Sequence, residues 1–140
     1  RAEEFEVGFE LSGLDILVEG RPNDLARLFR NLIDNAVTHS PRGSLVRVTG
    51  TREGAFAVVV VEDEGEGVPN EDRSRIFEPF FRGARSRALA TGGSGLGLGI
   101  AREVARSHGG NLTLDKSVFG ARFVVELPIA ATRPSRTSLE

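Results

Sequence analysis

One segment carries an unbroken amphipathic helix pattern, and it constrains the fold of this 140-residue chain more than any other feature. Between residues 25 and 37, apolar side chains recur at intervals of three and four residues, the period of an α-helix. They are Leu25, Leu28, Phe29, Leu32, Ile33, Ala36 and Val37. Pro22 suits the first turn and Asn23 or Asp24 suits the cap, so we predict a helix that starts here and is closed by a turn at 40–43.

Strand patterns lie on both sides of this helix. Alternating apolar and polar residues predict a half-buried strand over 5–11, and a short strand is predicted over 16–18. A hairpin is predicted from 45–51 and 55–61, and two last strands over 112–114 and 122–127. A short helix is predicted over 70–76 and a longer one from Leu96 to the stop at Gly109-Gly110. Strands at both ends with helices between predict an α+β fold. We expect a two-layer sandwich, with a mixed, mostly antiparallel sheet covered on one face by about three helices.

Composition excludes several classes of function. The net charge of −2 argues against a nucleic-acid-binding surface, and the absence of cysteine excludes disulfides and thiolate metal sites. No apolar run approaches the ~20 residues that span a bilayer. Because the chain has no methionine, we expect it to be a piece of a longer protein. One domain is expected over 1–131, followed by a disordered tail over 132–140.

Two asparagines lie one turn apart on the long predicted helix, at the edge of its apolar stripe. At about 100° per residue, Asn31, Asn35 and Thr38 fall on the same side. Asparagine is a mediocre helix former, and its amide oxygen is a neutral, hard ligand that suits Mg²⁺. Solvated surface amides are the alternative interpretation, but the pair at a core boundary favours a site.

A carboxylate with two glycines ends the second hairpin strand, as Asp63-x-Gly65-x-Gly67. Glycine lets the backbone adopt a positive φ and lets a flat ligand lie close against it. A carboxylate there accepts a hydrogen bond from the exocyclic amino group of adenine, whereas guanine presents a carbonyl in its place. An acidic, glycine-rich turn without a ligand is the alternative.

The strongest local motif is a glycine-rich run with five glycines among residues 92–99, at the start of a predicted helix. Backbone N–H groups at such a position hold phosphates, helped by the helix dipole. It is neither a Walker A loop, since Lys116 is the only lysine, nor a G-x-G-x-x-G motif. Residues 82–94 are predicted to form a mobile loop, in which Arg82 either contacts a polyphosphate or is simply solvated. His108 is expected to interact with helix carbonyls.

In order and spacing, residues 20–127 resemble the catalytic ATP-binding domain of sensor histidine kinases. The segments that carry the resemblance are 31–36 (N box), 63–67 (G1 box), 76–82 (F box), 93–98 (G2 box), the helix end 108–110 and a last glycine box at 120–123. The resemblance implies the Bergerat ATP-binding fold, shared with gyrase, mismatch-repair ATPases and anti-sigma serine kinases, with ATP and Mg²⁺ as cofactors.

The resemblance also implies roles for individual residues. Asn35, with Asn31 nearby, would bind Mg²⁺ and the phosphates, and Asp63 would accept a hydrogen bond from the adenine amino group. Gly65 and Gly67 would shape the base pocket, and 82–92 would be the ATP lid with Arg82 on a phosphate. The lid would be anchored by the glycine box and the residues around it, namely Gly93, Ser94, Gly95, Leu96, Gly97 and Leu98.

Four positions depart from relatives of this fold. Thr38 stands where such kinases often have a phosphate-binding lysine, and His39 where an aromatic stacks near the base. Ala121 stands where the last glycine box usually has threonine. Gyrase-type ATPases have a catalytic glutamate at the position of Asn31, and an amide cannot accept a proton from water. We therefore expect ATP to be held for transfer rather than hydrolysed.

The function that the resemblance implies is that of a protein-histidine kinase. The domain would donate the γ-phosphate of Mg-ATP to a histidine on a separate helical dimerisation domain, and a response regulator would be the downstream partner. This chain would be a monomeric cytoplasmic domain of a membrane-bound sensor. Neither His39 nor His108 has the acid-flanked helical setting of an acceptor. An anti-sigma-type serine kinase, or a degenerate interaction module suggested by Thr38 and Ala121, remains as an alternative.

Overall fold

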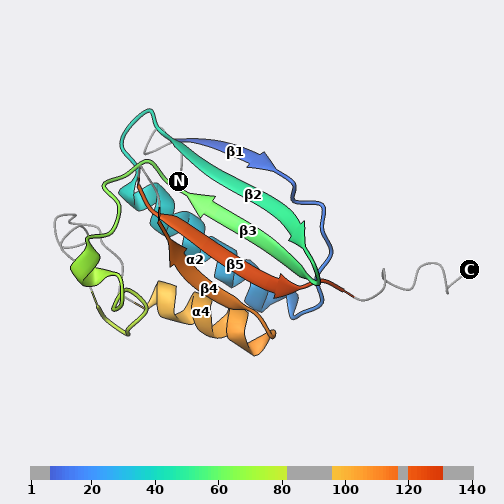
Figure 1. Ribbon diagram of the computed structural model, residues 1–140. Coiled ribbons are helices and arrows are strands. Elements are labelled where there is room, and N and C mark those ends of the chain that lie inside the picture. Colours follow the sequence, from blue (N-terminus) through green and yellow to red (C-terminus); the bar gives the residue numbers. More distant parts are fainter. Residues whose placement is uncertain (1–6, 82–95, 117–119, 131–140) are drawn as a thin grey trace, which may run out of the picture.

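The computed structural model describes residues 7–81, 96–116 and 120–130. In this part of the chain five strands form one mixed sheet, in the order β1-β2-β3-β5-β4 (Figure 1). They are β1 (Gly8–Ser12), β2 (Leu45–Glu53), β3 (Phe56–Glu62), β4 (Asn111–Asp115) and β5 (Arg122–Pro128). β1 runs parallel to β2, and the other neighbouring pairs are antiparallel. The predicted hairpin and the predicted α+β class are confirmed.

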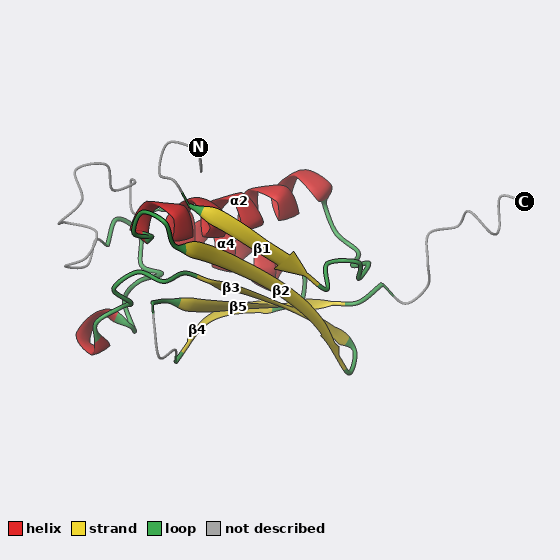
Figure 2. Ribbon diagram, turned by 90° about the horizontal axis from the view of Figure 1, so that it is seen from above, coloured by secondary structure: helices red, strands yellow, loops and turns green. Residues whose placement is uncertain are grey.

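Two α-helices cover one face of the sheet, as Figure 2 shows from above. They are α2 (Pro22–His39) and α4 (Gly97–Ser107), and they pack against each other. The short helix expected over 70–76 is only a single 3-10 turn, η1 (Asn70–Asp72). The covering layer in the described residues is therefore two helices rather than about three. None of these helices is long and apolar enough to cross a membrane.

The core lies between the sheet and the two helices. The largest fully buried side chains come from α2 and from four strands: Leu28, Leu32, Val37, Val46, Val61, Leu112 and Val125. Burying a side chain of this size contributes about 1.5–3 kcal/mol each. α4 contributes only Ala101 and Ala105 as fully buried residues. These small side chains let α4 lie close to its neighbours.

Two strand predictions are wrong in detail. β1 is exposed at all five positions rather than half-buried, and Leu11 is 61% exposed. Alternation indicates which residues can share a face, but β1 is the edge strand of the sheet, so only one of its sides is paired with another strand in the described part of the chain. The short strand expected over 16–18 is reduced to one isolated bridge between Val18 and Ile129. Residues 5 and 6 of the first predicted strand lie outside the described residues.

The start of α2 differs from the predicted cap. Pro22 occupies the first turn as expected, but the N-cap is Arg21, and no side chain caps the helix from that position. The Arg21 guanidinium bonds the Asp24 carboxylate at 2.6 Å, and this hydrogen bond lowers the pKa of Asp24 below its ordinary value. The Arg21 N–H donates to Nε2 of His108, 3.0 Å away. A residue 87 positions later thus supplies the acceptor, which local sequence cannot reveal.

Candidate functional site

Asp63 is the buried polar centre of the site, and it follows directly on β3. It is 3% exposed, and its Oδ1 accepts hydrogen bonds from the N–H groups of Gly65 (2.9 Å) and Ala121 (3.1 Å). The Asp63 N–H donates in turn to the Ala121 carbonyl at 3.0 Å. β3 and β5 pair antiparallel up to Glu62 and Arg122, so Asp63 and Ala121 face each other one step beyond the register. The carboxylate is therefore fixed by two backbone donors from two loops.

Glycines allow three backbone segments to meet around this carboxylate. A Cβ at Gly65 would overlap the carbonyl oxygen of His39, at the end of α2. A Cβ at Gly120, where φ is +66°, would overlap the carbonyl oxygen of Asp63. A Cβ at Gly67, where φ is +79°, would stand 3.0 Å from the carbonyl oxygen of Gly120. No other residue type fits Gly65 or Gly120 without displacing the backbone that holds Asp63.

The polar face of α2 lies against the first turn of α4. The side chain of Asn31 is the nearest neighbour of Gly97, with its Cγ 3.6 Å from where a Cβ would stand. Its Nδ2 is buried and has no hydrogen-bond partner within the described part of the chain. A buried amide donor without a partner costs about 1–3 kcal/mol, so this atom is arranged for an acceptor other than the residues that the structure describes. Asn35, one turn later, is half-buried on the same side of α2.

Phe77 connects the start of α4 to the sheet. Its ring meets the ring of Phe123 edge to face at 6.3 Å, and the Arg102 guanidinium lies over it at 4.5 Å. A Cβ at Gly99 would stand 2.6 Å from the Phe77 carbonyl oxygen, so glycine is needed at this point of α4. These contacts hold the first turn of α4 beside α2 and beside the loop after β3.

Comparison with known proteins decides the family. Residues 20–131 match the profile of HATPase_c, described as histidine kinase-, DNA gyrase B-, and HSP90-like ATPase. This chain belongs to that family. Among its relatives are the sensor-like histidine kinase SenX3 of Mycobacterium tuberculosis, 44% identical over 115 residues, and the sensor histidine kinase RppB of Synechocystis, 36% identical over 129 residues. These alignments cover 81% and 91% of this chain, respectively.

Solved structures agree with this assignment. The mycobacterial sensor histidine kinase MprB superposes with a TM-score of 0.83 at 33% identity, over 94% of this chain and 90% of that one. The ATP-binding domain of PrrB from M. tuberculosis gives 0.70 at 29% identity, over 90% and 82%. The chain spans only 28% of the length of SenX3 and of RppB. It is thus an HATPase_c catalytic domain of the sensor histidine kinase type, and the larger part of such relatives lies outside its span.

Several residues singled out in the sequence come together in this HATPase_c domain. Gly65 lies beside Asp63 and against the end of α2, at the His39 carbonyl, and Asn31 lies against Gly97 at the start of α4. Asn35 lies between these two contacts along α2. Thr38 and His39 occupy the last turn of α2 and are half-buried. Leu96 is the N-cap of α4, and Leu98 packs against the hydrophobic core.

Other predicted positions of the HATPase_c domain lie outside the described residues. They are Arg82, Gly93, Ser94 and Gly95, together with the predicted lid over 82–92 and the tail over 132–140. Segment 120–123 is visible in the sequence as a glycine motif, but the role of its backbone is visible only in the structure, where Ala121 both donates to Asp63 and accepts from it. The local sequence, a small residue after a glycine, does not predict this contact, because the contact depends on the pairing of β3 with β5.

The metal-ligating side chains of the HATPase_c domain fit a magnesium ion only if a bound ligand supplies further oxygen atoms. The described residues contain no group of three or more histidine or acidic side chains that would hold a metal ion by themselves. Mg²⁺ typically keeps several waters and takes one or two protein oxygens plus substrate phosphates. The amide oxygen of Asn35 is suited to one such position. Asn31, with its unpartnered Nδ2, is suited to an anionic acceptor beside it.

Proposed function

We propose that this domain binds Mg-ATP and donates its γ-phosphate to a histidine on a separate helical dimerisation domain. The observation that carries the proposal is the buried Asp63, fixed by two backbone donors in a loop whose Gly65 packs against the end of α2. A rigid carboxylate acceptor at one end of the site and amides at the other match a ligand with an amino-bearing ring and an anionic chain. Among the relatives, full-length ShkA was solved in complex with AMPPNP, and it shares 27% identity and a TM-score of 0.73 with this chain.

In this proposal Asp63 accepts a hydrogen bond from the adenine amino group, and Gly65 and Gly67 leave room for the flat base. Asn35 gives an oxygen to Mg²⁺, while the Nδ2 of Asn31 donates to a phosphate oxygen. The remaining contacts are assigned by motif alone: Thr38 and His39 at the end of α2, Arg82 on a phosphate, and Gly93, Ser94, Gly95, Leu96, Gly97 and Leu98 at the lid anchor.

We propose transfer rather than hydrolysis because the position of the water-activating base holds no residue that can accept a proton. Asn31 occupies the place of the glutamate that activates water in gyrase-type ATPases, and an amide cannot take that proton. Phosphoryl transfer depends mostly on positioning and on neutralising phosphate charge. The acceptor histidine belongs, in this proposal, to the protein's own helical domain, with a response regulator as the next acceptor. The catalytic unit itself is proposed to be a monomeric cytoplasmic domain over 1–131.

Calorimetric titration tests the nucleotide proposal. ATP with Mg²⁺ should bind saturably, ATP with EDTA more weakly, and GTP at least tenfold more weakly than ATP. Asn35→Ala should remove most of the difference between the Mg²⁺ and EDTA titrations. Asn23→Ala is the matched control, because it makes the same change at an exposed position in the first turn of the same helix. An absence of binding at millimolar ATP would favour the degenerate interaction module.

A second assay separates the two kinase alternatives. The domain is mixed with labelled ATP and the helical histidine domain of the full-length protein, and the phosphorylated product is treated with acid and with alkali. A histidine kinase gives a phosphoryl–nitrogen bond that acid cleaves and alkali spares. A product stable in acid would indicate a serine kinase instead.

A further inference from the structure

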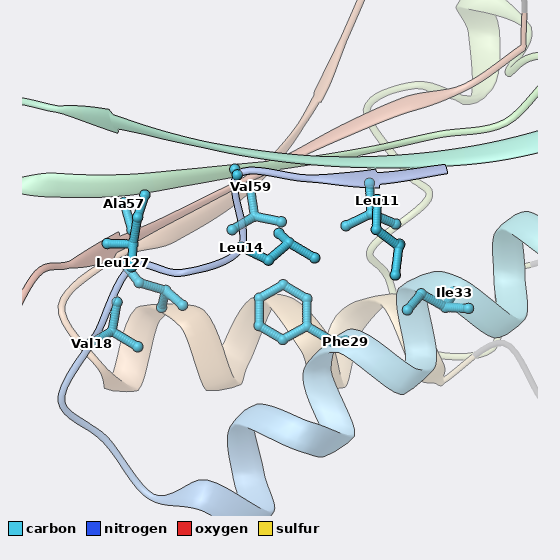
Figure 3. Close-up of a pocket in the computed structure, with 12 residues that line it drawn as sticks. Leu11, Leu14, Val18, Phe29, Ile33, Ala57, Val59 and Leu127 are labelled. Atoms are coloured by element: carbon cyan, nitrogen blue, oxygen red, sulfur yellow. The ribbon is translucent and has the colours of Figure 1, made fainter. Parts of the chain in front are cut away.

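A second concave feature lies away from Asp63, under the segment that joins β1 to α2. It is a cavity of about 340 Å³ between that segment, α2 and the covered face of the sheet (Figure 3). Figure 3 shows Leu14, Phe29 and Val59 pointing toward one another across it. The β1–α2 segment supplies one wall, the helix a second, and the strands β2, β3 and β5 the floor.

Every side chain that lines this cavity is apolar. None of its twelve lining residues carries a charged or polar side chain, and the set consists of glycine, alanine, valine, leucine, isoleucine and phenylalanine. An apolar hollow offers water too few hydrogen-bond partners to hold it in place. A dry cavity of ~150 Å³ already binds benzene, and this one is about twice that size.

The cavity and the candidate nucleotide site use opposite sides of α2. Phe29 and Ile33 line the cavity, whereas Asn31 and Asn35 project from the other side of the same helix. Asp63 is not among the lining residues. A ligand in the cavity would therefore meet none of the groups proposed to contact ATP.

The walls of the cavity are held by close backbone contact. Gly13, at φ +69°, lies so close to Gly50 of β2 that a Cβ on either would overlap the carbonyl oxygen of the other. This contact pins the segment after β1 onto the sheet. Two leucines of the lining are also open to solvent, Leu11 at 61% and Leu14 at 49%. The entrance is thus apolar as well.

The last described residue, Ala130, lies near the cavity, since its N–H donates to the Leu17 carbonyl. Residues 131–140 contain one large apolar side chain, Leu139. Residues 1–6 contain one, Phe5, which precedes the far end of β1. A hollow walled on three sides also suits a small molecule better than the flat surface of a protein.

We propose that this cavity is a binding site for a small uncharged molecule with an alkyl or aromatic body. Its walls give apolar contact on three sides, and they give no partner to a charged or strongly polar group. Recognition there depends on shape and burial, so size and neutrality select the ligand.

Toluene is the probe, titrated into the nucleotide-free domain while the methyl resonances of Val, Leu and Ile are followed by NMR. Saturable shifts confined to the lining residues are expected, and benzoate, which carries a charge that the cavity cannot pair, should give none. Val59→Phe fills the cavity and should weaken toluene binding at least tenfold. Val58→Phe is the matched control on the opposite face of β3 and should change it less than twofold.

Three titration results would overturn the proposal: no saturable shift with toluene, equal binding by both variants, or equal binding of benzoate. If Val59→Phe does not fold, Ala57→Val at the cavity floor takes its place, and it should weaken toluene binding by a smaller factor. Concentration-dependent dimerisation that shifts the same methyl groups without toluene would also overturn it, because a second copy would then fill the cavity. Nucleotide is absent throughout, so the result does not depend on the proposed kinase function.

Discussion

At the scale of single residues, the carboxylate of Asp63 serves the fold and the proposed ligand together. Its Oδ1 joins the loop after β3 to the loop before β5 through Gly65 and Ala121. A carboxylate has about four acceptor positions, so it can keep these backbone donors and also accept from an amino group. The same side chain thus links two loops and is the candidate group that recognises the adenine ring.

Asp63→Asn separates these two roles. An amide oxygen can still accept from the two backbone N–H groups, so the melting temperature should change by only a few degrees. The amide NH₂ would meet the adenine amino group donor to donor, and a lost bond to a charged acceptor costs about 1.5–3 kcal/mol. Calorimetry should therefore show ATP affinity reduced roughly 10- to 150-fold. Unchanged affinity in a folded variant would remove Asp63 from the nucleotide site.

Gly120 is a residue whose importance lies in its backbone. Gly120→Ala introduces strain at φ +66° and also overlaps the Asp63 carbonyl, whereas Gly54→Ala introduces similar strain at φ +61° with nothing within 4 Å. Left-handed strain costs about 1–2 kcal/mol, so urea unfolding should show a loss of that size for Gly54→Ala. Overlap with fixed backbone adds about 1–3 kcal/mol for Gly120→Ala. Equal losses would mean that the loop before β5 adapts freely.

At the scale of elements, His108 ties the end of α4 to the start of α2. Its Nδ1 lies 2.8 Å from the Val104 carbonyl, and its Nε2 accepts the Arg21 N–H at 3.0 Å, which assigns the proton to Nδ1. The Arg21 N–H lies at the start of α2, where backbone N–H groups lack partners within the helix. The Val104 carbonyl also accepts from the His108 N–H and the Ser107 hydroxyl. The predicted interaction of His108 with helix carbonyls is confirmed, and its bond to the Arg21 N–H is an addition from the structure.

His108→Ala should lower the free energy of unfolding by about 1–2 kcal/mol, because two hydrogen bonds are lost and the Arg21 N–H loses its acceptor. Urea denaturation measures this loss. Glu103→Ala, at an exposed position one turn earlier on α4, is the control and should stay within about 0.5 kcal/mol of the unchanged protein. If the two variants unfolded alike, the link between the helices would contribute nothing to stability.

Elements with a strong local period could be predicted from the sequence, and those that depend on distant partners could not. The apolar stripe of α2, the alternation of β2 and the continuous apolar run of β3 gave the correct type and nearly the correct bounds. The exposure of β1 follows from its edge position, which its own residues do not encode. The cap at Arg21 depends on His108, so Asn23 and Asp24 were wrong candidates.

At the scale of the whole molecule, the candidate site exists only because strands distant in sequence are paired. Ala121 reaches Asp63 across 58 positions through the β3–β5 ladder, and Asn31 reaches Gly97 through the packing of α2 on α4. The motifs single out candidate residues for the site. How the backbone of Gly120 and Ala121 fixes the carboxylate depends on tertiary contacts, and no local pattern in the sequence specifies them.

A ligand that contacts all of these segments should stabilise the whole domain. Mg-ATP at 100 times its dissociation constant contributes about 2.7 kcal/mol by mass action if it binds only the folded state. For a domain of this size the melting temperature should rise on the order of 10 °C, as a thermal unfolding scan would show. EDTA should reduce the rise by removing the metal, and Mg-GTP at the same concentration should give about half of the rise or less. In Asp63→Asn the rise with Mg-ATP should also fall to about half or less, whereas in Val59→Phe it should persist, because the cavity lies on the other side of α2 from Asn31 and Asn35. A rise of the same size with GTP would contradict selection of the base by Asp63, even if the triphosphate binds.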